Sequence, residues 1–211
     1  MAVIHRATLV PTKLELIHPW LARQPWAGGD GELSRVGSYR FDDPDGEVGI
    51  EGFIVERGGT IFHLVLTYRG APLAGAEPWL IGTMEHSALG TRWVYDGAGD
   101  PAAVAALMRG ARGEQEQAVL EVHDGDTVVG VQEPDVRVYA SGAGAPSFAG
   151  APFAGSAGQL PALVSDGRVC EVTFGGATLR VARVLGSEVG GGAQLVARWR
   201  DGADSVAALA G

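Results

Sequence analysis

The spacing of the hydrophobic positions predicts one strand and one short helix at the start of the chain. Apolar residues dominate 2–10, which is typical of a strand, whereas those of 13–17 fit one face of a helix. Thr12 is placed to cap this helix, with Glu15 in its first turn, where the helix dipole favours a negative charge. Pro19 disfavours helical backbone at the residue before it, so we expect the helix to end or bend there.

From residue 33 onward the hydrophobic pattern has a period of two, which is typical of strands. Asp42–Gly46 and Gly58–Gly59 interrupt the alternation with residues that favour tight turns. The three strands predicted around these turns are 33–41, 48–56 and 60–68. Consecutive strands joined by short turns form an antiparallel meander, and we expect the N-terminal helix to cover one face of it.

The middle of the chain carries a second predicted helix between further strands. Asp100 is a favoured N-cap and Pro101 suits the first helical position, so a helix is predicted over 101–110. The strands predicted on either side of it are 79–89 and 92–96, joined at Gly90, and 119–122 and 127–131, joined by a turn.

The C-terminal part differs in composition. Residues 141–161 are rich in Gly, Ala, Ser and Pro, which is typical of a linker or a long loop. The elements predicted beyond it are strands at 168–174, 178–185 and 194–199, and a short final element at 206–209. The predicted fold class is α+β: an antiparallel β-meander covered by a short N-terminal helix and a second helix near 101–110, followed by a β-rich C-terminal unit. The predicted domains are a cap-like α+β domain at 1–130, a loop or linker at 131–161, and a small β-rich unit at 162–211 that packs on the first.

Composition and charge narrow the classes of partner. The chain has 211 residues, a formal net charge of −9 and a pI of 5.0, so neither nucleic acid nor a membrane surface is an expected partner. No apolar stretch approaches the roughly 18 residues that a membrane span needs, and no secretory signal is visible, so we expect a cytoplasmic protein. The high content of Ala, Gly, Val and Arg is typical of a GC-rich bacterium. Cys170, the one cysteine, is interpreted as a small buried residue, with a reactive thiol as the alternative.

Three segments resemble parts of one known domain. Trp20–Gly29 (WLARQPWAGG) resembles the WLPxQRWFGGK signature near the start of maltokinases, and Val94–Pro101 (VYDGAGDP) is similar to a later stretch of the same N-terminal cap domain. Residues 80–96 resemble stand-alone cap-like proteins of GC-rich bacteria, some of which are labelled 1,4-α-glucan branching proteins. The chain departs from the signature at Pro25, where the kinases have arginine, and at Asp30, where they have lysine.

The side chains that phosphoryl transfer requires are missing from the sequence. Kinases of this type hold ATP phosphates and magnesium with a strand lysine, aspartates and an asparagine. The one lysine, Lys13, lies on the predicted N-terminal helix, and the chain contains no asparagine. His123–Asp126 (HDGD) superficially resembles a catalytic loop, but we interpret it as the turn between two predicted strands. We therefore exclude an autonomous kinase, and the succession of meanders excludes the (β/α)₈ barrel of a branching enzyme.

A few residues remain as candidates for chemistry or binding. Glu85 and His86 could act as an acid–base pair, with Asp96 as a third catalytic candidate. Neighbouring side chains on a strand point to opposite faces, however, which favours a structural role for His86. The aromatic residues that could stack on carbohydrate, or fill the core instead, are Trp26, Trp93 and Tyr95. No cluster of Cys and His has metal-ligand spacing, so neither a metal nor a cofactor is expected.

These observations favour a non-catalytic cap-like module without a kinase lobe. The resemblance covers about residues 1–123 and implies a protein partner, either a sugar kinase or another enzyme of α-glucan, trehalose or amino-sugar metabolism. Two alternatives stay open: an enzyme half that completes a sugar phosphotransferase in trans, and a carbohydrate-binding protein.

Overall fold

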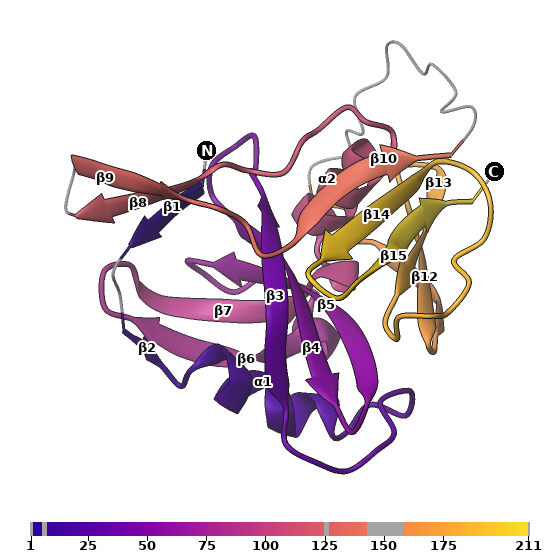
Figure 1. Ribbon diagram of the computed structural model, residues 1–211, viewed down its shortest axis with the longest axis horizontal. Helices are drawn as coiled ribbons and strands as arrows, with labels where there is room; N and C mark the ends of the chain where they lie inside the picture. The colour runs from indigo at the N-terminus through magenta and orange to yellow at the C-terminus, as the bar shows by residue number, and fades with distance from the viewer. Residues whose placement is uncertain (1, 6–7, 125–126, 143–157, 211) are drawn as a thin grey trace.

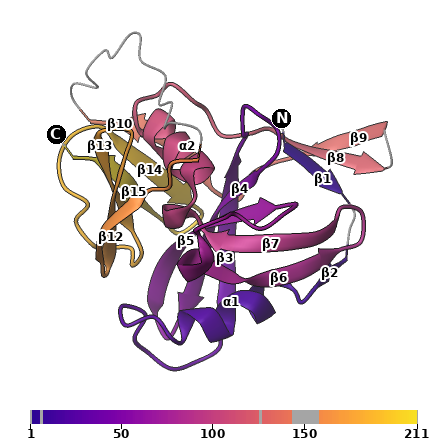
Figure 2. The ribbon, with the colours of Figure 1, turned by 180° about the vertical axis from the view of Figure 1, so that it is seen from behind.

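The computed structural model describes residues 2–5, 8–124, 127–142 and 158–210. Two six-stranded antiparallel sheets flank helix α2 (Pro101–Ala111), and a small three-stranded sheet projects from one side of the molecule (Figure 1). Helix α1 (Lys13–Leu21) lies against the first large sheet (Figure 2). Within the described residues, neither helix is long and apolar enough to cross a membrane. Strands dominate, and the predicted α+β class holds at this level.

The first large sheet contains the predicted meander. Its strands in spatial order are β2 (Leu9–Val10), β6 (Leu80–His86), β7 (Gly90–Asp96), β5 (Thr60–Arg69), β4 (Gly49–Arg57) and β3 (Ser34–Phe41). The pairing of β3 with β4 and of β4 with β5 confirms the meander. β7 rather than β6 then pairs with β5, because the chain crosses to the outer position through a 3₁₀ turn, Glu77–Trp79, before β6 begins.

Helix α1 covers one face of this sheet, as predicted. Thr12 and Glu15 form a reciprocal capping box, in which the backbone N of Thr12 donates to Oε2 of Glu15 at 2.8 Å. Ile17 and Leu21 are fully buried in one hydrophobic cluster with the sheet. The helix runs through Pro19 to Leu21 instead of ending there. A proline in the last turn removes only one backbone hydrogen bond, and the burial of Leu21 offsets that loss.

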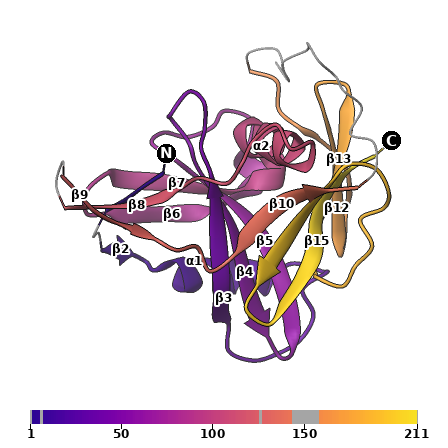
Figure 3. The same ribbon diagram turned by 45° about the horizontal axis from the view of Figure 1, so that its top comes forward.

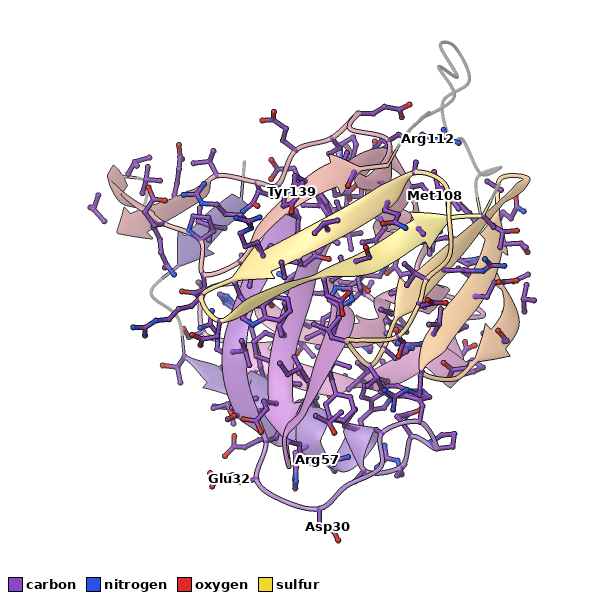
Figure 4. All side chains as sticks on the ribbon, turned by 45° about the vertical axis from the view of Figure 1, so that its right-hand side comes forward. Asp30, Glu32, Arg57, Met108, Arg112 and Tyr139 are labelled. Atoms are coloured by element: carbon purple, nitrogen blue, oxygen red, sulfur yellow. The ribbon has the colours of Figure 1, made fainter. Side chains whose placement is uncertain are left out.

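The C-terminal part forms the second large sheet. Its strands in spatial order are β10 (Arg137–Ser141), β14 (Gln194–Trp199), β15 (Gly202–Leu209), β13 (Ala177–Ala182), β12 (Val169–Phe174) and β11 (Ala162–Asp166). The buried residues of α2 share one hydrophobic cluster with strands of both large sheets, and Met108, labelled in Figure 4, is fully buried in it. Cys170 is also buried there, and burial raises the pKa of its thiol to about 12. β10 and β11 were not predicted, because their mostly exposed side chains give no alternating pattern.

The three-stranded sheet corrects the prediction for the N-terminus. The single strand expected over 2–10 is divided between β1 (Ala2–His5), which pairs in parallel with β8 (Leu120–Asp124), and β2, which belongs to the first large sheet. β8 pairs with β9 (Thr127–Gln132), which confirms the predicted hairpin. Gly125 and Asp126 of the HDGD segment lie outside the described residues.

The two large sheets meet where β13 ends. Phe62 on β5 forms an isolated antiparallel bridge with Val184, and the backbone N of His63 donates to the carbonyl of Arg183 at 3.0 Å. This contact brings charged residues of both sheets together inside the molecule.

Candidate functional site

A buried arginine lies at the junction of the two large sheets. Nη2 of Arg183 lies 2.7 Å from Oδ2 of Asp96, at the end of β7, and its Nε donates to Oδ1 of Asp166 on β11 at 3.3 Å. The guanidinium carbon lies 5.2 Å from the ring centroid of Trp26. Burial alone would lower the pKa of Arg183, but the carboxylates of Asp96 and Asp166 and the thiol of Cys170 together outweigh burial and raise the pKa. The guanidinium therefore stays charged and ties three distant segments together.

A neutral histidine lies next to this arginine. Nδ1 of His63 lies 3.1 Å from the carbonyl oxygen of Ala182, and Nε2 lies 2.9 Å from the hydroxyl of Tyr39. Since a carbonyl only accepts, Nδ1 carries the proton and Nε2 accepts from the tyrosine. Burial, together with the positive charge of Arg183, lowers the pKa of His63 to about 4. The imidazole is thus uncharged at neutral pH and links strands of both large sheets.

His63 should make the fold sensitive to mild acid. Its pKa in the folded state is below the ordinary 6.5, so the unfolded chain binds the proton more tightly and stability falls as the pH falls from 6.5 toward 4. We expect His63 to account for a loss of about 2 kcal/mol in the free energy of unfolding between pH 7 and pH 5. Urea unfolding of wild type and His63→Gln at both pH values measures this difference. His18→Gln, at an exposed position of α1, is the matched control; an equal pH dependence in all three proteins would contradict the prediction.

A second buried carboxylate holds the start of α2. Asp100 is fully buried; Oδ1 accepts from the backbone N of Ala102 at 3.0 Å, and Oδ2 accepts from the hydroxyl of Thr67 at 2.7 Å. Arg69 donates to both carboxylate oxygens at 2.7 Å. One side chain thus caps the helix and fixes it to β5.

The one lysine is also engaged in the fold. Nζ of Lys13 lies 2.6 Å from Oε2 of Glu51 on β4, and the same oxygen accepts from the hydroxyl of Tyr68 at 2.7 Å. The ammonium lies over the rings of Phe53 and Tyr68, 5.8 and 5.5 Å from their centroids. Burial would raise the pKa of Glu51, but the charges of Lys13 and Arg40 outweigh it and lower the pKa to about 2. This ion pair fastens α1 to the sheet.

The structure places the three catalytic candidates at two separate ends of the β6–β7 hairpin. Oε1 of Glu85 is exposed and accepts from the hydroxyl of Thr91 at 2.8 Å, while Nδ1 of His86 accepts from two backbone N–H groups of the turn at 3.2 Å each. His86 pairs with Gly90, whereas Asp96 lies at the far end of β7, roughly 20 Å along the strand. Glu85 and His86 therefore do not share a cleft with Asp96.

The three aromatic candidates lie on opposite faces of the first sheet. Trp26 is 7% exposed and packs with Trp20 at a centroid distance of 6.0 Å, in the cluster that also contains Val94. Neighbouring residues of a strand point to opposite faces, so Trp93 and Tyr95 face away from that cluster. Tyr95 is buried, and Trp93 is partly exposed. The three rings therefore do not form one stacking platform.

Comparison with protein families finds a match for one part of the chain. Residues 20–100 match the family model of the maltokinase N-terminal cap domain. This part of the chain is similar to a maltokinase N-terminal cap domain. The matched segment, which we call the cap region, spans the end of α1, strands β3 to β7 and the turn before α2. The match is narrower than the range of about 1–123 that the sequence motifs indicate. Searches among curated proteins and solved structures found no match.

Sequence reasoning missed the residues that connect the cap region to the rest of the chain. Trp26 and Asp96 belong to the cap region, but Arg183, which contacts both, lies far beyond it. An arginine between Ala182 and Val184 gives no local signal of burial, and its partners could not be identified without the pairing of β5 with the segment after β13. Among the described residues, no group of three His, Cys, Asp or Glu side chains is close enough to hold a metal ion.

A shallow groove lies beyond the cap region. It has a volume of about 610 Å³ and lies between the end of α2, the segment 115–120 and strands β9 and β10. Tyr139 on its rim is 44% exposed and is labelled in Figure 4. The guanidinium carbon of Arg198 lies 6.0 Å from the Tyr139 ring centroid, so one face of this ring is already occupied. The groove therefore offers at most one open aromatic face to a ligand.

Proposed function

We propose that this chain is a non-catalytic cap-like module that binds and regulates a partner protein, a sugar kinase or another enzyme of α-glucan, trehalose or amino-sugar metabolism. The match to a domain described as the N-terminal cap of a kinase supports this proposal, since a cap acts together with the lobe that it accompanies. The chain contributes recognition in this proposal, and the partner contributes the chemistry.

One observation carries the non-catalytic part of the proposal. The charged groups that phosphoryl transfer would use are engaged within the fold, in the pairs Lys13–Glu51, Asp96–Arg183 and Asp100–Arg69. Phosphoryl transfer needs cations and carboxylates that face ATP and magnesium, and moving these residues outward would break buried ion pairs. The simplest role for these three ion pairs is therefore to stabilise the fold, and not to take part in catalysis.

The alternatives receive less support from the same residues. Carbohydrate stacking needs exposed rings on one face, but Trp26 and Tyr95 are buried. An enzyme half acting in trans would need free acid–base groups near one another, whereas Glu85 and Asp96 lie at opposite ends of a hairpin. Neither arrangement matches the chemistry that these alternatives require.

The test combines binding with activity. The purified chain is titrated into sugar kinases and glucan or trehalose enzymes encoded near its gene, by calorimetry, and their turnover is measured with and without the chain. We expect one of them to bind with a dissociation constant on the order of micromolar or below and to change its kcat or KM. ATP-dependent phosphorylation of a sugar by the chain alone, or failure of every candidate to bind, would contradict the proposal.

Lys13→Arg is the control that separates a cap from an enzyme half. Arginine keeps the positive charge beside Glu51, so the fold is retained. If the chain supplied an ATP-binding lysine in trans, this variant would abolish the activity of the mixture. A cap leaves the activity of the mixture unchanged.

A further inference from the structure

The three-stranded sheet carries an exposed apolar strand at its outer edge. β9 pairs with β8 on one side only, and its exposed valines are Val128 (49%), Val129 (53%) and Val131 (62%). We call these three residues the valine strip. The β8–β9 hairpin projects away from both large sheets (Figures 1 and 3). An unprotected apolar edge of this kind is a template for pairing with another strand.

Four other edges in the described part of the chain, the outer strands of the two large sheets, are protected. The backbone N of Ala118 donates to the carbonyl of Arg40 at 2.8 Å and so covers the edge of β3. The side-chain amide of Gln117 accepts from the backbone N of Val138 at 2.7 Å at the edge of β10. β2 is only two residues long, and β11 carries a charged residue, Asp166, at its end. These are the usual ways in which edges are kept from pairing, and β9 lacks such cover.

β9 is itself irregular against β8 near Val129, but this does not prevent pairing. β15 has the same kind of irregularity against β14 and still pairs with β13 on its other side. A bulge increases the local twist of a strand without removing the N–H and C=O groups of its neighbours. The outer edge of β9 therefore keeps groups that can pair.

We propose that a second copy of this chain packs on the valine strip about a two-fold axis. Thr127–Gln132 contains no charged residue, although the chain has a net charge of −9. Two acidic copies repel each other over most of their surfaces, so an uncharged strip is where they can approach, and a two-fold axis sets that strip against itself. Antiparallel pairing of the two β9 strands joins two three-stranded sheets into one of six strands and brings the valines of the two copies into cross-strand contact.

Sedimentation equilibrium of the full chain tests this proposal. We expect a mass of twice 21.8 kDa at high concentration, and tighter association at higher salt, which screens the charge of −9. Val131→Glu should raise the dimer dissociation constant at least about tenfold, since it places like charges close to the two-fold axis. Val164→Glu, at a valine that is 55% exposed on β11, is the matched control and should leave the constant unchanged.

A mixing experiment excludes a general effect on folding. Val131→Glu and Val131→Lys should each weaken self-association, and an equal mixture of the two should restore a dimer because opposite charges then meet across the axis. A wild-type chain that stays monomeric at every concentration, a dimer that survives Val131→Glu, or a mixture that fails to associate would each overturn the proposal. Self-association goes beyond partner binding, and neither result depends on the other.

Discussion

Replacing Arg183 with methionine is expected to lower the free energy of unfolding by about 3–5 kcal/mol, because a buried charge loses its partner. Asp96 is 4% exposed and would keep its carboxylate inside the junction without the guanidinium that lies 2.7 Å away. Trp26 would lose the cation over its ring as well. Urea unfolding followed by tryptophan fluorescence measures the loss, and Trp26 lies close enough to report on this site.

Two further variants show whether the buried charge causes the loss. Arg180→Met, on β13 three residues before Arg183, removes an ion pair with Glu171 in which the arginine side chain is 38% exposed, and should cost less than about 1 kcal/mol. Adding Asp96→Asn to Arg183→Met should recover part of the stability, since no unpaired charge is then left behind. Equal losses for Arg180→Met and Arg183→Met would show that burial does not determine how much each ion pair contributes to the free energy of unfolding.

The elements that local signals specify could be predicted from the sequence. The N-cap Asp100 with Pro101 after it places the start of α2, and the glycine turns place the β3–β5 meander. The pairing of Ala2 with Leu120 and the position of β7 beside β5 could not be predicted. Those pairings join segments that are distant in sequence, and no local pattern of hydrophobic residues records which strands become neighbours.

The candidate site shows the same limit at the level of side chains. The sequence shows Trp26 and Asp96 as aromatic and acidic candidates, but their roles depend on Arg183, which the sequence shows only as a charged residue in an apolar segment. The same limit applies to His63, because a histidine among apolar residues of β5 gives no sign in the sequence of its contact with Ala182. Burial and partner together decide whether such a residue is structural or chemical.

The cap region depends on the rest of the chain for its charge balance. Asp96 is inside the cap region and is neutralised by Arg183, while Asp100, at its last position, caps a helix that lies outside it. The C-terminal part of the chain therefore completes one buried ion pair of the cap region. Among the described residues, surfaces open to a partner include the turn of the β6–β7 hairpin, the groove beside α2 and the valine strip.

Asp100→Ala is expected to be the second most damaging single change, with a loss of about 3–4 kcal/mol in the free energy of unfolding. The variant removes the N-cap of α2, which costs about 1 kcal/mol, and leaves the guanidinium of Arg69 and the hydroxyl of Thr67 without their acceptor. Asp100→Asn keeps an oxygen for the backbone N of Ala102 but loses the negative charge, so its loss should be intermediate. Thr12→Ala, at the exposed cap of α1, provides the control and should cost about 1 kcal/mol. If Asp100→Ala costs no more than Thr12→Ala in urea unfolding, the ion pair with Arg69 adds nothing to the cap, and the tie between α2 and β5 must come from apolar packing alone.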